Sequence, residues 1–413
     1  MKRTLILFFA TSILFSCTKI PPAHIEKTIL LYQASNNNLT SYSIENINSL
    51  MDVENGAYLP DYFDKGESGD VLLVYQHLKG ESPKLFRLSQ NNRRKAVKEL
   101  IYEYENHNSM DPKIFREILN QVNILFPAQE RGLILSSHGT GWLPIHFYGQ
   151  NFSKSHNNSE WAGSRRDVFV DTEAHLVKSM GAKSFGEDAN EEMEIFDLTE
   201  ALPTTYSYII FDACLMGGIE VAYQLRNLTD YVMASQTEIL ADGFPYNTMM
   251  SSLFNANGAD LVGVAKKYYD LYNEKSEKYM RSATISLVET KYIENLANKA
   301  KLILNRDKSK IGSLNMAEMQ GFFRYNNHWF YDFLDFYKGI SSDNTEYQNL
   351  EDALNKCVVY KASTEYFFEG LGSGFQIKRN SGLSTYIPNP ENSALDNYYK
   401  RYDWNKDVQI VSE

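Results

Sequence analysis

The sequence is poor in cysteine, with three among 413 residues: Cys17, Cys214 and Cys357. A disulfide framework needs several paired cysteines, so this fold must depend on a hydrophobic core. The HExxH, CxxC and phosphate-loop patterns that mark common zinc, metal or redox, and nucleotide sites are all missing. There is also no internal repeat and no low-complexity tract. These absences exclude repeat arrays and the simplest metal and nucleotide sites.

Positive charge is also scarce, since 41 Lys and Arg stand against 52 Asp and Glu, for a net charge of −11. This balance argues against nucleic acid as a partner and mildly favours a cationic or neutral ligand. Apolar residues make up 43% of the chain, with 28 Tyr and 23 Phe. Such a composition can build a sizeable core, and the length suits one large domain with an extension.

The first residues are arranged as an export signal. Lys2 and Arg3 precede an apolar stretch, 5–15, that is too short to span a bilayer, which takes roughly 20 residues. The stretch ends Leu-Phe-Ser-Cys17, which resembles the lipobox of bacterial lipoproteins. We therefore expect residues 1–17 to be a lipoprotein signal, with Cys17 lipidated and the protein held in the bacterial cell envelope, periplasmic or at the cell surface. The alternative is an ordinary export signal in which Cys17 is incidental.

Residues 18–27, with two adjacent prolines, predict an extended tether. Short apolar runs then predict strands at 28–33, 71–75, 132–136, 206–211 and 231–235. Helical patterns lie between them, near 112–125 and 217–225. Continuously apolar strands that alternate with helices indicate a mostly parallel sheet covered on both faces, a three-layer α/β sandwich.

Beyond residue 255 the pattern is mainly helical. The predicted helices are 261–271, 292–304, 330–337 and 347–360, and two late strands are predicted at 374–378 and 383–387. We therefore expect a core domain over 28–255 and a mainly helical extension over 256–413 that packs on it.

Two short motifs fall at the carboxyl ends of predicted strands. His138 and Gly139 follow the third strand, and Asp212-Ala213-Cys214 follows the fourth. In parallel sheets, ligands bind beyond the carboxyl ends of the strands, so neighbouring strands would bring His138 and Cys214 to one edge. Between the motifs, residues 149–194 are polar and irregular, and a loop of that length is usually functional or mobile.

A thiol and an imidazole at one edge are suited to nucleophilic catalysis. The imidazole favours the thiolate of Cys214 and can later protonate a leaving amine. Gly139 would let its backbone N–H approach an oxyanion, with the N–H of Cys214 as second donor. A helix predicted to begin near Met216 would place its positive end beside the thiol. Without catalysis, Cys214 is a small core residue, His138-Gly139 a turn, and Asp212 a helix cap.

The other histidines lack a matching cysteine or a metal-ligand spacing. His24 lies in the tether, and His77 and His107 are expected to be exposed. The remaining positions, in the long loop or in an aromatic packing region, are His146, His156, His175 and His328. The glycine clusters at 217–218 and 370–374 are expected to serve packing or turns.

Residues 137–142 (Ser-His-Gly-Thr-Gly-Trp) and 211–217 (Phe-Asp-Ala-Cys-Leu-Met-Gly) resemble the two motifs of the clostripain family of cysteine peptidases, relatives of caspases, gingipains and legumains. Segments 28–39, 234–246 and 382–388 are similar to that family as well, so the resemblance runs from about residue 28 to near the end. It implies a caspase-like fold and a cysteine endopeptidase with Cys214 as nucleophile and His138 as general base and acid.

The resemblance also implies a preference for Arg or Lys before the cut, with Asp212 at the base of the S1 pocket. Family members often cut themselves between the two motifs, where Arg166 and Lys183 are our candidate sites. No cofactor is implied, although Ca²⁺ dependence occurs in the family and the acidic run 187–194 could bind calcium weakly; a solvated charged stretch is the alternative. Gln236 departs from the family, because an acid is expected there.

The expected partners are a peptide or protein substrate and a membrane, reached through the lipid anchor, with no nucleic acid; the oligomeric state stays open. A catalytically silent binding lipoprotein on the same fold is the alternative, and action on a non-protein amide or thioester is a third reading.

Overall fold

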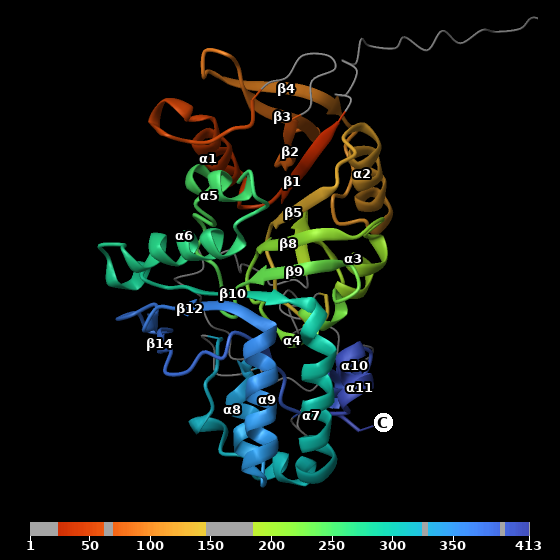
Figure 1. The fold of residues 1–413 in the computed structure, drawn as a ribbon, viewed down its shortest axis with the longest axis vertical. Coiled ribbons are helices and arrows are strands. Elements are labelled where there is room, and N and C mark those ends of the chain that lie inside the picture. Colours follow the sequence, from red (N-terminus) through yellow and green to blue (C-terminus); the bar gives the residue numbers. More distant parts are fainter. Residues whose placement is uncertain (1–23, 62–68, 146–184, 324–328, 389–392, 413) are drawn as a thin grey trace, which may run out of the picture.

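The computed structural model describes residues 24–61, 69–145, 185–323, 329–388 and 393–412. A nine-stranded sheet forms its centre, in the order β12-β10-β9-β8-β5-β1-β2-β3-β4 (Figure 1). The strands are β1 (Ile25–Ser35), β2 (Gly69–Leu78), β3 (Lys84–Gln90), β4 (Ala96–Glu103), β5 (Glu130–Ser136), β8 (Tyr206–Asp212), β9 (Thr229–Ala234), β10 (Thr284–Glu289) and β12 (Val358–Ser363).

The five central strands, β9-β8-β5-β1-β2, are all parallel, as their continuous apolar runs predict. Antiparallel strands complete both edges: β3 and β4 on one side, β10 and β12 on the other. These four edge strands were not predicted from the sequence. β12 follows helix α9 (Asn344–Cys357) without a break, so the predicted helix 347–360 ran into it.

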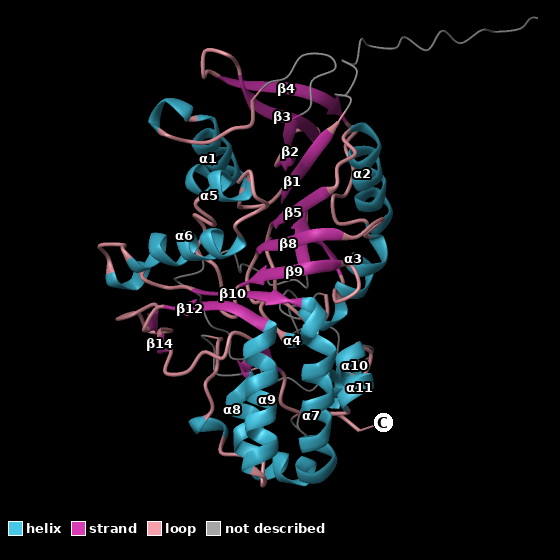
Figure 2. Cartoon of the chain, viewed as in Figure 1, coloured by secondary structure: helices cyan, strands magenta, loops and turns pink. Residues whose placement is uncertain are grey.

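Helices cover both faces of the sheet (Figures 1 and 2). On one side lie α1 (Thr40–Met51), α5 (Tyr246–Leu253) and α6 (Leu261–Asn273). On the other lie α2 (Pro112–Leu125) and α3 (Ile195–Ala201), with α4 (Ile219–Gln224) near α3. The Asp111 side chain caps α2 by accepting from the N–H groups of Lys113 and Ile114, and Pro112 occupies its first turn, as predicted.

The C-terminal part is mainly helical and lies below the sheet in Figure 1, with α7 (Ile293–Asp307), α8 (Phe333–Ile340), α9, α10 (Ser393–Tyr399) and α11 (Asp403–Val408). Yet β10 and β12, from the predicted extension 256–413, are strands of the central sheet. The extension is therefore built into the core sheet as well as packed below it.

Short elements complete the described chain. The two late predicted strands correspond to β14 and β15, of two residues each. The short strands are β6 (Phe185–Asp188), β7 (Glu191–Met193), β11 (Tyr331–Asp332), β13 (Tyr366–Phe367), β14 (Phe375–Gln376) and β15 (Ser384–Thr385). The 3-10 helices are η1 (Val53–Asn55), η3 (Lys278–Met280), η4 (Thr290–Tyr292), η5 (Lys308–Ser313) and η6 (Met316–Glu318).

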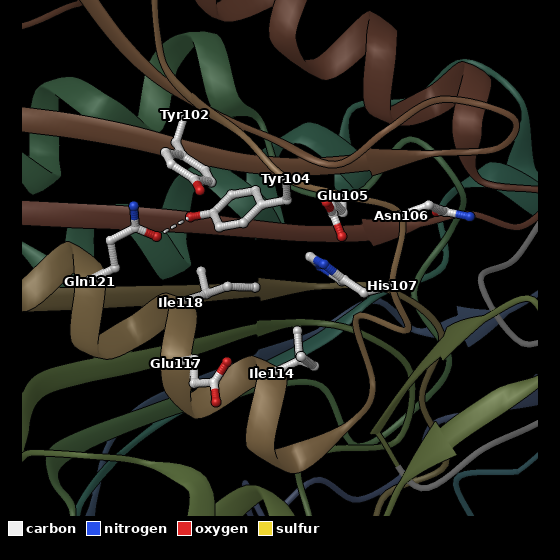
Figure 3. Close-up of a pocket in the computed structure, with 9 residues that line it drawn as sticks. All are labelled: Tyr102, Tyr104, Glu105, Asn106, His107, Ile114, Glu117, Ile118 and Gln121. Carbon is white, nitrogen blue, oxygen red and sulfur yellow. Dashed lines mark hydrogen bonds between the residues drawn. The ribbon is translucent and has the colours of Figure 1, made fainter. Parts of the chain in front are cut away.

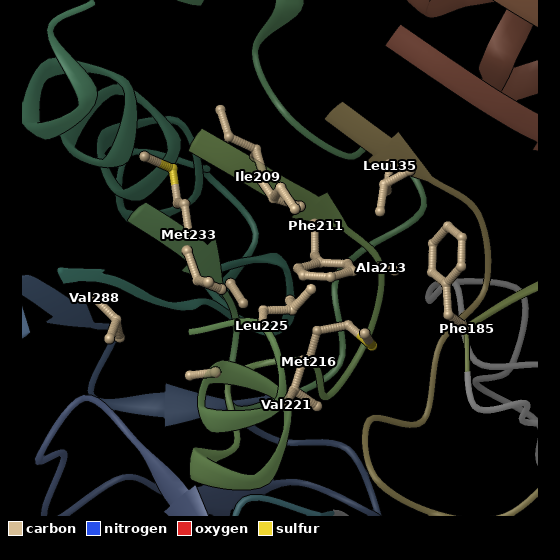
Figure 4. Packing of buried hydrophobic residues seen from close by; sticks show 14 of the residues in the cluster. Leu135, Phe185, Ile209, Phe211, Ala213, Met216, Val221, Leu225, Met233 and Val288 are labelled. Carbon is tan, nitrogen blue, oxygen red and sulfur yellow. The ribbon is translucent and has the colours of Figure 1, made fainter. Parts of the chain in front are cut away.

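Apolar side chains fill the space beneath the carboxyl ends of the central strands (Figure 4). Ile209 and Phe211 of β8 are fully buried there, together with Val221 and Leu225 at α4. Burial of one such side chain contributes about 1.5–3 kcal/mol. The edge of the sheet that carries the predicted motifs therefore rests on a tightly packed support.

Two predicted boundaries need correction. β1 begins at Ile25, so the end of the predicted tether 18–27 already belongs to the sheet. The end of the predicted loop 149–194 is ordered, because the β6–β7 hairpin occupies 185–193 and Glu194 is the residue before α3. No helix among the described residues is long and apolar enough to cross a membrane.

Candidate active site

The register of β5 and β8 brings the two motifs together. Ser136 pairs with Asp212 at the carboxyl ends of these parallel strands, so His138 and Cys214 each lie two residues beyond the pair. Gly139 approaches Cys214 closely: a Cβ added at Gly139 would lie 2.7 Å from Cys214 O and 3.2 Å from Cys214 N. The expectation that parallel strands place both motifs at one edge is confirmed by this contact.

A tight loop carries Cys214 out of β8. Leu215 adopts a left-handed conformation, with φ of 62°, which costs a non-glycine residue about 1–2 kcal/mol. Its N–H donates to Thr237 O at 2.9 Å, and the N–H of Gly217 donates to Ser235 O at 2.7 Å. Gly141 must also be glycine, because a Cβ there would lie 2.3 Å from Leu215 O. The loops of the two motifs are thus packed backbone against backbone.

Cys214 is buried, and its Sγ accepts a hydrogen bond from the N–H of Ile239 at 3.1 Å. The thiol in turn donates to Ile239 O at 3.7 Å, so the backbone of Ile239 holds the sulfur through both its N–H and its C=O. The helix predicted from Met216 is different in the structure, because α4 begins only at Ile219 and has six residues. The helix-dipole effect fades within the first turn, so the predicted helix start beside the thiol is wrong.

His138 is buried, and its Nε2 faces two acceptors. Asn38 Oδ1 lies at 2.7 Å and Glu187 Oε2 at 3.5 Å from Nε2. Two oxygen acceptors at Nε2 place the proton there, so Nδ1 is the basic nitrogen of the neutral ring. The sequence predicted no role for Asn38 and only weak calcium binding for the run that contains Glu187. The available signal was the asparagine run 36–38, which follows β1, the strand next to β5.

Asp212 is fully buried, and its Oδ2 accepts hydrogen bonds from Ser136 Oγ and Tyr246 OH, both at 2.8 Å. Burial, and then the nearby Asp212 carboxylate, raises the pKa of Tyr246 well above its usual value, so the phenol stays a donor. Asp212 does not cap the next helix, since the residue before α4 is Gly218 and makes no side-chain cap. The helix-cap reading of Asp212 is therefore wrong.

Gln236, where the family resemblance led us to expect an acid, serves the C-terminal part of the fold. Its Nε2 donates to Ser286 Oγ at 2.7 Å and to Gly382 O at 2.9 Å. A Cβ on Gly217 would lie 2.6 Å from the same Nε2, which confirms the packing role expected of that glycine. The amide thus joins the loop after β9 to β10 and to the segment before β15.

The expectation that His77 is exposed is wrong, because its side chain is 1% exposed beside Asp188. His107 is partly buried and bonds to Tyr75 OH at 2.8 Å. It borders a pocket of about 560 Å³ (Figure 3) that His138, Asp212 and Cys214 do not line. The pocket is lined by Tyr102, Tyr104, Glu105, Asn106, His107, Ile114, Glu117, Ile118 and Gln121.

Three predicted residues, Cys17, Arg166 and Lys183, lie outside the described residues. Within the described ranges, no group of three or more His, Cys, Asp or Glu side chains could hold a metal ion. Asp188, in the acidic run proposed for weak calcium binding, is buried and bonded to His77 and Asn36. The alternative, that the run 187–194 is a solvated charged stretch, is therefore wrong for Asp188.

Comparisons with known proteins agree on one family. The model of the clostripain family matches residues 31–153 and 171–413. An inactive zymogen C11 protease from Parabacteroides distasonis is 30% identical, over 94% of this chain and 99% of that one, with a TM-score of 0.73. A search of curated proteins gave no match.

Two structures from Bacteroides thetaiotaomicron are also similar. A secreted C11 cysteine protease, "iotapain", is 24% identical over 93% of this chain and 99% of that one, with a TM-score of 0.74, which supports the fold. A secreted C11 cysteine protease in complex with an irreversible peptide inhibitor is 25% identical over 93% and 98%, with a TM-score of 0.72. With the family match over most of its length, this chain belongs to the clostripain family and is a cysteine endopeptidase.

Proposed function

We propose that the protein hydrolyses peptide bonds with Cys214 as nucleophile and His138 as general base and acid, through a thioester acyl-enzyme. The observation that carries this proposal is the close contact of the two motifs at one sheet edge, with His138 Nε2 held by Asn38. That tautomer makes Nδ1 the nitrogen that exchanges a proton with the thiol.

Acylation of Cys214 comes first, and hydrolysis of the thioester follows. Cys214 Sγ bonds to the substrate carbonyl carbon after its proton has passed to His138, and the C–N bond then breaks as the imidazolium protonates the leaving amine. Water next gives a proton to His138 and attacks the thioester carbon. The C–S bond breaks, the carboxylic acid product leaves, and His138 returns the proton to Sγ.

The oxyanion of each tetrahedral intermediate needs fixed donors. We assign this role to the N–H groups of Gly139 and Cys214, supported by how closely Gly139 approaches the Cys214 backbone. Backbone donors held by packed loops need no reorganisation during the reaction, and one such donor is worth about 2.7–4 kcal/mol of barrier.

We assign recognition of Arg or Lys at P1 to Asp212. Its carboxylate is buried two residues before the nucleophile, and a buried carboxylate is stabilised by a guanidinium or ammonium group. Ser136 and Tyr246 orient its Oδ2.

Maturation and location also belong to this proposal. The Parabacteroides relative was solved as an inactive zymogen, which supports synthesis of this chain as a precursor. Cleavage after Arg166 or Lys183 would separate the two motifs into two chains, and lipidation of Cys17 would anchor the protein in the cell envelope. Calcium dependence is proposed from the family alone and is tested by adding a chelator.

The test is cleavage of a fluorogenic peptide library varied at P1 by residues 18–413, by the Cys214→Ala variant, and by Cys357→Ala as the matched control. Cys357 is buried, and burial raises its pKa to about 12, so its loss should leave activity intact. If the parent and Cys357→Ala cleave after Arg or Lys and Cys214→Ala does not, the result supports the dyad and the S1 assignment. Cleavage after acidic or apolar residues overturns the S1 assignment, and full activity in Cys214→Ala overturns the dyad.

A further inference from the structure

A short segment crosses the ends of the strands next to the candidate dyad. This crossing segment, residues 185–189, lies between the two motifs in the sequence. The N–H of Gly186 donates to His138 O at 2.9 Å, and the N–H of Glu187 donates to Ser137 Oγ at 3.0 Å. Phe185 packs on Phe211 of β8, with ring centroids 5.9 Å apart (Figure 4). The crossing segment is therefore fixed directly over the motif that carries the imidazole.

Asp188 ties the crossing segment to the rest of this edge. Its side chain is 2% exposed. Oδ2 accepts from His77 Nδ1 at 2.8 Å and from the N–H of Ser109 at 2.5 Å, and Oδ1 accepts from Asn36 Nδ2 at 2.7 Å. Burial alone would raise the pKa of Asp188, but the hydrogen bonds from His77 and Ser109 outweigh it and lower the pKa. Asp188 is thus a buried carboxylate that stays ionised.

The Asp188 carboxylate is bonded to the turn that carries one of the two groups facing His138 Nε2, and Asp188 is the chain neighbour of the other. Asn36 belongs to the turn after β1 that also presents Asn38, and Asn37 Nδ2 of that turn donates to Glu187 O at 2.7 Å. Glu187 is the neighbour of Asp188 in the crossing segment. One buried group therefore joins the element that carries the Asn38 acceptor to the element that carries the Glu187 acceptor.

We propose that Asp188 is a positioning residue for His138, holding Asn38 and Glu187 at Nε2 so that the imidazole keeps its orientation and its protonated form is stabilised. The inference rests on the proposed function of His138. By analogy with metal-binding histidines, mutation of a residue that orients a reactive imidazole through an intermediate group commonly lowers activity tenfold to a hundredfold.

Further titratable groups surround Asp188, and their protonation can also change with pH. His77 comes from β2. Tyr75, also from β2, bonds to Ser109 Oγ and to His107, both at 2.8 Å, and Tyr32 of β1 donates to Ser109 O at 2.8 Å. Burial lowers the pKa of His107 and raises the pKa of Tyr75 well above its usual value, beyond any working pH. Changes at Asp188 must therefore be compared over a full pH profile.

The experiment measures kcat/KM against pH for the processed parent, for Asp188→Asn and for Asp307→Asn. Asp307 is the matched control, because it is also a buried carboxylate with backbone and hydroxyl donors, at the end of α7. We expect Asp188→Asn to lose about tenfold to a hundredfold in kcat/KM. The alkaline limb should move to lower pH, because the imidazolium loses support from Glu187. Asp307→Asn should lower the unfolding temperature without moving either limb.

A double-mutant cycle with Asn38→Ala separates positioning from general loosening. If Asp188 acts through Asn38, the loss in the double variant is smaller than the product of the two single losses. Multiplicative losses, or an Asp188→Asn profile identical to that of the parent, overturn the inference. If Asp188→Asn fails to fold, Asn36→Ala replaces it; the same movement of the alkaline limb supports the inference, and an unmoved profile overturns it. An inactive parent would instead overturn the proposed function.

Discussion

Substitution of Gly139 by alanine tests the geometry on which the proposed mechanism depends. The three atoms nearest to the added Cβ would be Cys214 O at 2.7 Å, Ala213 Cβ at 3.0 Å and Cys214 N at 3.2 Å. All three are backbone or Cβ atoms that no side-chain rotation can move away. Because ordinary contact begins at 3.4 Å, the loops of His138 and Cys214 must separate by about 0.7 Å, the difference between 3.4 and 2.7 Å.

A displacement of this size has consequences for rate and for stability. A misplacement of about 1 Å can cost about a hundredfold in rate, so Gly139→Ala should lower kcat/KM by about tenfold to a hundredfold. Overpacking should lower the free energy of unfolding by about 1–3 kcal/mol.

The assay is cleavage of a fluorogenic peptide at a temperature where all variants are folded, with thermal unfolding measured in parallel. Gly312→Ala is the matched control, since a Cβ there meets nothing within 4 Å and the backbone is not left-handed. Parental kcat/KM in Gly139→Ala would refute the reasoning. A large loss in Gly312→Ala would show that the assay reports folding rather than the site.

Three further predictions concern the same edge of the sheet. Asp212→Asn should lower cleavage after Arg and Lys by at least tenfold while leaving Cys214 reactive toward a small alkylating probe, and equal P1 preference in parent and variant would contradict the S1 assignment. Gly186→Ala should destabilise the fold by about 1–3 kcal/mol in urea titration, because its φ is 76° and a Cβ would lie 2.0 Å from Met110 Sδ; an unchanged midpoint would refute this. Burial raises the pKa of Glu194 to about 7 from an ordinary 4.5, so the native state holds this proton more tightly than the unfolded chain. Its contribution, on the order of 3 kcal/mol, is fully present below pH 4.5 and is lost as the pH rises through 7; Glu194→Gln should flatten this part of the pH dependence of urea unfolding.

Some features of the fold follow from local pattern alone. Continuously apolar runs at β1, β5 and β8 predict central parallel strands because such strands are buried on both faces. The edge strands β3 and β10 gave a weaker signal, since both carry polar residues among their apolar ones, as at Lys84 and Arg87 of β3.

By itself, the sequence determined that the motifs of His138 and Cys214 lie at the carboxyl edge of the sheet, because each follows an apolar run typical of a central parallel strand. Only the tertiary structure decided what surrounds them. Asn38 lies 100 residues from His138 along the chain, and Asn36 lies 152 residues from Asp188. No periodicity connects such positions, because side-chain hydrogen bonds between distant segments form only after the sheet has brought their ends together. The burial of Asp212 beneath the nucleophile was decided in the same way, by Ser136 and Tyr246 from two other elements.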